Sequence, residues 1–348
     1  MAKKTAASNE GFATLKSDLR QKTPGRCYVF HGEENYLKEY YLRSLKKQLL
    51  DDLTEQFNFH RLTAENFSME ELTDSVEAYP MMSERSLIQV DEVNLFKLPD
   101  AERDRLAAML SDLPEHCCLV FYYDAVPFQP DKRLKKLWTA LSKAATIVDF
   151  QKQGERELAD WVARHFLSAK KQITPDLCRY LVVRTGGSMS LLQSEIEKLC
   201  AFVEGAQISK TDIDTVVEPV LDAVAFDISN AVSAGDYPSA LRKLRTLLQK
   251  QEEPIVILAA LGTQIRRLNV ARILRNQGKG ADSLMNLYSM GEYPARITMQ
   301  QAQRLSDEFC AQAVLLCLQT DEQLKTSYDE PERLLELLLL RLAQEAKR

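Results

Sequence analysis

Short apolar runs alternate with amphipathic stretches over the first 150 residues of the chain. Several runs are nearly unbroken, which is typical of strands buried on both faces of a sheet. We expect strands at 26–31, 57–62, 86–91, 117–123 and 146–150. The stretches between them have helical spacing, and we expect helices at 33–50, 69–78, 100–112 and 131–143, after an N-terminal helix near 11–20. This alternation predicts a parallel sheet covered by helices.

Helical patterns replace the strand pattern after residue 150. Thr174 before Pro175, and Ser209 three residues before Asp212, are typical of helix starts. We therefore predict an α/β domain followed by all-α domains. Their expected bounds are 1–150 for the α/β domain, 151–218 for a small helical domain and 219–348 for a C-terminal helical domain.

The last predicted helix is apolar around most of its circumference between Leu334 and Leu342. A helix of this kind is buried on several sides. Either a partner protein covers part of it, or the chain buries it within its own C-terminal domain, and the sequence leaves both interpretations open.

The charge of the chain is modest, with 50 acidic and 45 basic residues, and no segment is strongly basic. General electrostatic capture of DNA is therefore not the main function, and any DNA contact must be local. The polar N-terminus has no apolar signal-peptide core, and no apolar stretch approaches the length of a membrane span. We expect a soluble cytoplasmic protein without a membrane partner.

The seven Cys residues include no CxxC pair, and the four His residues show no metal-ligand spacing. Cys117 and Cys118 are adjacent, where ordinary disulfide geometry is unfavourable. We expect reduced, apolar Cys side chains. We also expect no metal, no other cofactor and no catalytic residue.

A phosphate-loop frame, GxxxxGK[ST], can be laid on the segment that follows the first predicted strand. Gly32 and Lys38 match the frame. Leu37 replaces the glycine that lets the backbone wrap a phosphate, and Glu39 replaces the hydroxyl that holds Mg²⁺. The acidic pair at 33–34 adds negative charge where an anion would bind. We expect this degenerate loop to bind no nucleotide.

A second ATPase-like feature is the acidic pair Asp91 and Glu92 at the end of an apolar strand. In working ATPases such a pair holds Mg²⁺ and positions water. Acidic residues also end many strands that have no such role. The pair therefore allows either an active NTPase or ordinary strand-end charges in a fold that lacks the activity, and the degenerate loop favours the second.

Four blocks of sequence, in order, resemble segments of the bacterial DNA polymerase III delta family. They are YVFHGEENYLKEYY at 28–41, AYPMMSERSLIQVDE at 78–92, CLVFYYDAVPFQPDKRLKKLWTAL at 118–141 and GGSMSLLQSEIEKLCAFV at 186–203. The pattern of the remaining C-terminal part is compatible with that family, so the resemblance covers nearly the whole chain.

The resemblance implies an AAA+-like protein with a RecA-like α/β domain, a small lid-type helical domain and a helical collar for oligomerisation. It implies a clamp-loader subunit that binds and opens the beta sliding clamp for loading onto primed DNA, without binding ATP itself. The implied partners are the clamp, the gamma/tau ATPase subunits, delta prime and primed DNA. The DNA-directed DNA polymerase activity belongs to the whole complex. An active AAA+ NTPase and a helical adaptor unconnected to replication remain as alternatives.

Met81 and Met82 follow Pro80 and lead into a predicted strand. The resemblance implies that this apolar pair inserts into a hydrophobic pocket on the clamp, and flexible, polarizable Met side chains suit such a pocket. From the residues alone, the pair could equally pack beneath its own sheet.

Basic residues cluster at Lys132 and Arg133, and again at Arg266 and Arg267. Either cluster could contact the phosphates of primed DNA inside a loader ring. Runs of this kind are also typical of solvated helix faces, and the sequence leaves both interpretations open.

Overall fold

The computed structural model describes residues 7–346 of the chain. They belong to two compact units, one ending at Gln153 and the other beginning at Gly154. No helix within the described residues is long and apolar enough to cross a membrane.

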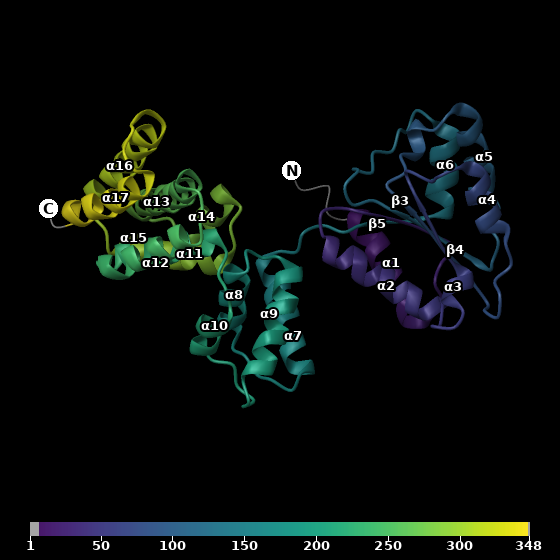
Figure 1. Ribbon diagram of the computed structural model, residues 1–348, viewed down its shortest axis with the longest axis horizontal. Helices are drawn as coiled ribbons and strands as arrows, with labels where there is room; N and C mark the ends of the chain where they lie inside the picture. Colours follow the sequence, from purple (N-terminus) through teal and green to yellow (C-terminus); the bar gives the residue numbers. More distant parts are fainter. Residues whose placement is uncertain (1–6, 347–348) are drawn as a thin grey trace. The chain divides into compact units, whose positions relative to one another are not determined.

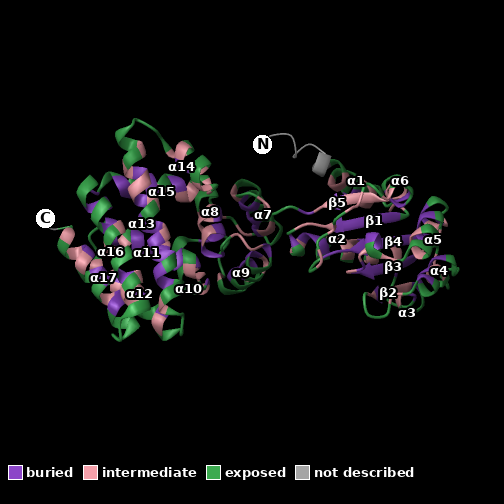
Figure 2. Cartoon of the chain, turned by 90° about the horizontal axis from the view of Figure 1, so that it is seen from above, coloured by how far each residue is buried: buried purple, intermediate pink, exposed green. Residues whose placement is uncertain are grey.

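The first unit is built on a five-stranded parallel sheet with the strand order β2-β3-β4-β1-β5 (Figure 1). The strands are β1 (Cys27–His31), β2 (Phe59–Thr63), β3 (Ser86–Asp91), β4 (Cys117–Tyr122) and β5 (Thr146–Asp149). The inner strands β3 and β4 are buried along their whole length (Figure 2). After β1 the chain crosses to β2 at one edge of the sheet, and after β4 it crosses to β5 at the other edge. The carboxyl ends of β1 and β4 therefore flank a topological switch point, where α/β proteins commonly bind ligands.

Helices cover both faces of this sheet, α1 and α2 on one side and α4, α5 and α6 on the other (Figure 1). Their bounds are α1 (Ala7–Gln21), α2 (Asn35–Leu49), α4 (Met69–Glu77), α5 (Asp100–Ser111) and α6 (Lys135–Ala144), with the short helices α3 (Glu55–Asn58) and η1 (Leu95–Lys97) between them. Ser68 caps α4 by accepting a hydrogen bond from the Glu71 N–H. The predicted α/β fold is confirmed.

Several strand ends differ from the prediction by one residue, and the largest difference is at the start of β2. Residues 55–58 form α3, so β2 begins at Phe59 rather than at residue 57. The carboxylate of Asp51 accepts hydrogen bonds from the N–H groups of Leu53 and Thr54, at 3.1 and 2.7 Å. These bonds turn the chain into a helical conformation that the apolar pattern alone does not reveal.

The second unit consists of helices. Its first part contains α7 (Glu155–Ser168), α8 (Pro175–Arg184), α9 (Met189–Phe202) and α10 (Lys210–Val216). The predicted helix starts are confirmed, since Thr174 caps α8 and Ser209 forms a capping box with Asp212. The second part contains α11 (Leu221–Ser233), α12 (Tyr237–Gln249), α13 (Pro254–Asn276), α14 (Ala281–Tyr288), α15 (Glu292–Gln303), α16 (Asp307–Thr326) and α17 (Pro331–Glu345).

An ion pair joins the two parts of the second unit. Arg184 on α8 is buried, and its Nη1 lies 3.1 Å from the Asp227 Oδ2 on α11. The two parts are therefore held together by a partly buried charge pair as well as by the chain. A separate small helical domain ending near residue 218 stays a prediction.

The last helix, α17, is buried mainly by its own unit. Leu335, Leu338 and Leu342 lie in the apolar core of the unit, whereas Leu337 and Leu340 are 39% and 47% exposed. Burial within the chain therefore accounts for most of the apolar circumference of this helix.

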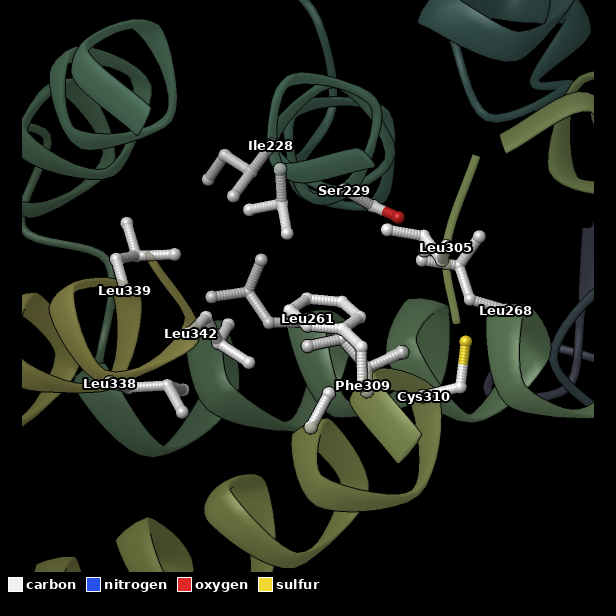
Figure 3. Close-up of a pocket in the computed structure, with 13 residues that line it drawn as sticks. Ile228, Ser229, Leu261, Leu268, Leu305, Phe309, Cys310, Leu338, Leu339 and Leu342 are labelled. Carbon is white, nitrogen blue, oxygen red and sulfur yellow. The ribbon is translucent and has the colours of Figure 1, made fainter. Parts of the chain in front are cut away.

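A cavity of about 20 Å³ lies in the same core (Figure 3). Its lining is apolar except for the Ser229 hydroxyl and the Cys310 thiol. A space of this size has room for about one water molecule. The cavity is a packing feature and not a ligand site.

Candidate functional site

Met81 and Met82 lie in the turn between α4 and β3, with their side chains open to solvent. They are 56% and 90% exposed, so the interpretation that they pack beneath the sheet is wrong. Met82 also has a φ of 54°, a left-handed conformation that costs a residue with a Cβ on the order of 1 kcal/mol. Exposed apolar side chains on strained backbone are typical of binding sites.

Other exposed apolar side chains lie on the same turn and on the segment that bonds to it. Tyr79 precedes it in the same turn and is 84% exposed. The segment around α3 lies beside the turn, because the side chain of Asn58 bonds to the backbone of Met81. This segment contributes two more exposed side chains. The exposed apolar side chains of the two segments are Leu53, Phe57, Tyr79, Met81 and Met82.

The loop after β1, where a phosphate loop would lie, is closed by the backbone of Phe150, which follows β5. Gly32 has a φ of 114°, and a Cβ at this position would overlap the backbone of Phe150. The Phe150 N–H donates to the His31 carbonyl at 2.7 Å, and its carbonyl accepts from the Glu34 N–H at 2.9 Å. Gly32 therefore permits the close approach of two chain segments. Leu37, in place of the second glycine, is buried.

Lys38 is fully buried, whereas a phosphate-binding lysine must reach its ligand. Its Nζ donates to the Tyr123 carbonyl at 2.8 Å and to the Asp124 Oδ1 at 2.9 Å. Both acceptors lie just after β4, on the other side of the switch point. Glu39, the next residue on α2, is exposed. The ammonium group of Lys38 is therefore paired inside the protein.

The acidic pair Asp91 and Glu92, at the end of β3, also has hydrogen-bond partners within the protein. Asp91 is buried, and its Oδ2 accepts a hydrogen bond from the Arg61 Nε at 2.6 Å. Glu92 has a φ of 61°, and its carboxylate accepts from the N–H groups of residues 124–126 at distances between 2.7 and 2.9 Å. Successive N–H groups of this kind form a nest that binds anions. A carboxylate of the chain itself fills this nest.

Burial also changes the titration of groups beside the loop. Burial raises the pKa of the Glu34 carboxyl and lowers the pKa of His31, although Asp149 lies 3.7 Å from the His31 ring. Both shifts favour the neutral form, as expected where water has limited access. Within residues 7–346, no group of three or more His, Cys, Asp or Glu side chains is placed to hold a metal ion.

Some side chains of the two predicted basic clusters contact other residues of the protein itself. Arg133 donates from its Nε and Nη2 to the two carboxylate oxygens of Asp131 at 3.0 and 2.9 Å, and Lys132 lies over a Trp ring. On α13, Arg266 is exposed, whereas Arg267 is half-buried over a Tyr ring. Contact of Lys132, Arg133, Arg266 or Arg267 with DNA stays a prediction.

Asn58 and the nest around Glu92 carry no signal in the sequence. Asn58 lies at the start of a segment with a strand pattern, and its partner Met81 is 23 residues away. The nest depends on a left-handed residue at position 92, which is not a glycine. Neither feature follows from spacing or residue type.

Residues 28–151 match the family model described as DNA polymerase III, delta subunit. Residues 222–342 match the model of the DNA polymerase III delta subunit, C-terminal domain. Together the two matches cover well over half of the chain. The chain belongs to the DNA polymerase III delta subunit family. The resemblance of the four sequence blocks to this family is thereby confirmed.

Delta-family relatives match most of the chain. DNA polymerase III subunit delta of Bacillus subtilis is 24% identical over 319 residues, which are 90% of this chain and 92% of the relative. The probable subunit delta of Aquifex aeolicus is 23% identical over 288 residues, 79% of this chain and 78% of the relative. The solved structure of the Bacillus subtilis DNA clamp loader delta protein covers 95% of this chain and 99% of its own, with a TM-score of 0.58 and 23% identity. This likeness confirms the predicted fold, an α/β domain with a parallel sheet followed by helical parts.

Proposed function

We propose that this delta-family subunit binds the beta sliding clamp and opens it for loading onto primed DNA, without binding ATP itself. The observation that carries the proposal is the exposure of Met81 and Met82 on a left-handed turn, where the family resemblance implies a clamp-binding pair. Large apolar side chains that enter a pocket on a partner contribute about 2 kcal/mol or more each. The turn therefore has the chemistry of a binding anchor.

The engagement of the ATPase-like residues supports the absence of ATP binding. A phosphate at the switch point would have to draw Lys38 away from Tyr123 and Asp124. Breaking a buried ion pair costs about 3–5 kcal/mol, and less here because Asp124 is partly exposed. ATP is then bound by the gamma/tau subunits, and the helical collar joins this chain to them and to delta prime.

Equilibrium binding of the purified chain to the sliding clamp of the same organism, with and without ATP and Mg²⁺, tests the proposal. We expect the same clamp affinity in both conditions and no binding of a fluorescent ATP analogue. Micromolar analogue binding with Mg²⁺-dependent turnover would instead support an active AAA+ NTPase. A chain that does not bind the clamp would support a helical adaptor.

A further inference from the structure

The backbone of Met81 is held by a side chain from a different segment. The Asn58 Nδ2 donates to the Met81 carbonyl at 2.8 Å, and the Asn58 Oδ1 accepts from the Met81 N–H at 2.7 Å. Asn58 is only 1% exposed. Because both bonds go to one residue, the amide fixes the position and the orientation of the Met81 backbone.

The tip of the turn has little other polar support. Within the described part of the chain, no backbone–backbone hydrogen bond outside the helices and strands has a donor or an acceptor between Tyr79 and Glu84. Nearby, the Ser83 hydroxyl donates to the Arg85 carbonyl at 3.1 Å and to the Leu49 carbonyl, at the end of α2, at 3.4 Å. Without Asn58, the chain around Met81 would sample many conformations, and ordering it on binding would cost conformational entropy.

Asn58 is itself held in place by the short helix that it ends. Its N–H donates to the Thr54 carbonyl at 3.1 Å. The Thr54 hydroxyl donates to Asp51 at 2.8 Å, and Glu55 pairs with Lys46 on α2 at 2.7 Å. This segment therefore gives the amide a fixed support on the first unit.

We propose that Asn58 is a positioning residue, which pre-organises the Met81–Met82 turn for binding the sliding clamp. This inference rests on the proposed function and adds a residue that acts on the clamp only through Met81. Pre-organisation raises affinity because the turn is ordered before the partner binds. It also maintains a backbone in which Met82 is left-handed, a conformation that free chains rarely adopt.

Two variants test whether the hydrogen bonds of Asn58, and not its burial alone, support the Met81–Met82 turn. Asn58→Ala loses both bonds, and we expect its clamp affinity to fall about tenfold at every pH tested. In Asn58→Asp, a neutral carboxyl can donate to the Met81 carbonyl and accept from its N–H, as the amide does. A carboxylate can only accept, and it is repelled by the carbonyl oxygen. Burial beside that oxygen raises the pKa of the introduced carboxyl.

The expected result is a pH profile that a merely structural role would not produce. Because the protonated carboxyl supports the turn, the affinity of Asn58→Asp rises toward wild type as the pH falls through its raised pKa. The ratio of wild-type to Asn58→Ala affinity stays constant over the same range. At each pH, hydrogen exchange of the Met81 amide should be slowest in the protein with the highest clamp affinity and fast in Asn58→Ala. Asn66→Asp, on an exposed turn, is the matched control and shows no such profile.

The outcomes separate this inference from the proposed function. If Asn58→Ala binds the clamp as wild type does, or if Asn58→Asp shows no recovery at acidic pH, the positioning role is wrong and clamp binding stands. If wild type does not bind the clamp, the proposed function fails and the positioning role fails with it. If Asn58→Ala does not fold, the pH profile of folded Asn58→Asp decides.

Discussion

Lys38 and Asp124 form an ion pair, with 2.9 Å between Nζ and Oδ1, and the lysine side chain is fully buried. The pair joins the start of α2 to the segment that follows β4. In a phosphate loop, a lysine at this position would face a nucleotide. Here its hydrogen-bond partners belong to the protein, so Lys38 has a structural role.

Replacement of Lys38 by alanine should therefore destabilise the fold. We expect Lys38→Ala to lower the free energy of unfolding by about 3 kcal/mol, because the Tyr123 carbonyl loses its buried donor and Asp124 loses its charge partner. Urea denaturation measures the change. Lys47→Ala, an exposed position on the same helix, is the control and should change stability by less than about 0.5 kcal/mol. Equal stability of the two variants would contradict the structural role.

The carboxylate of Glu92 should order the segment after β4. We expect Glu92→Ala to cost about 2 kcal/mol, because three N–H groups lose a charged acceptor. Hydrogen exchange of the amides of residues 124–126 should become faster. Glu65→Ala, on an exposed turn, should leave both properties unchanged. Unchanged protection of these amides in Glu92→Ala would rule out the nest.

Cysteine labelling should distinguish Cys200, which is partly exposed, from the buried thiols. Burial raises the pKa of both Cys117 and Cys118 to about 12, so almost no thiolate forms at these positions at mildly alkaline pH. Cys200 is partly exposed, and we expect iodoacetamide to modify it first, as read by mass spectrometry of the folded chain. Its pKa is also raised by burial, so the reaction should speed up as the pH rises. Early modification of Cys117 or Cys118 would contradict the buried sheet.

The exposed leucines of α17 test the proposal that the C-terminal helices contact other loader subunits. We expect Leu337→Ser with Leu340→Ser to leave the melting temperature nearly unchanged and to weaken assembly with the ATPase and delta-prime subunits. Leu338→Ser, at a buried position, should lower stability by several kcal/mol. Size-exclusion chromatography of reconstituted mixtures reads assembly. A double variant that assembles as wild type does would exclude this face as the contact.

The elements of the first unit are largely predictable from sequence because parallel strands buried on both faces have unbroken apolar runs. β3 begins and ends at the predicted residues, 86 and 91. The start of β2 is not predictable from the apolar pattern, because it depends on the hydrogen bonds of Asp51. The helix starts at Thr174 and Ser209 follow from local capping chemistry.

The candidate sites are predictable only in part. The departure from the phosphate-loop frame follows from Leu37 and Glu39, which replace its second glycine and its hydroxyl residue. The burial of Lys38 does not follow from the sequence, because its partners Tyr123 and Asp124 lie in the connection after a different strand. The exposure of Met81 and Met82 is not predictable either, since an apolar pair before a strand suits a core and a binding surface equally.

The most direct test of the central claim measures clamp affinity and melting temperature on one variant, Met81→Ser with Met82→Ser. Both side chains are exposed, so we expect the melting temperature to stay close to that of wild type. Loss of two anchors of about 2 kcal/mol each should lower clamp affinity on the order of a thousandfold. A melting temperature that falls steeply, while the folded fraction still binds the clamp as wild type does, would contradict the account.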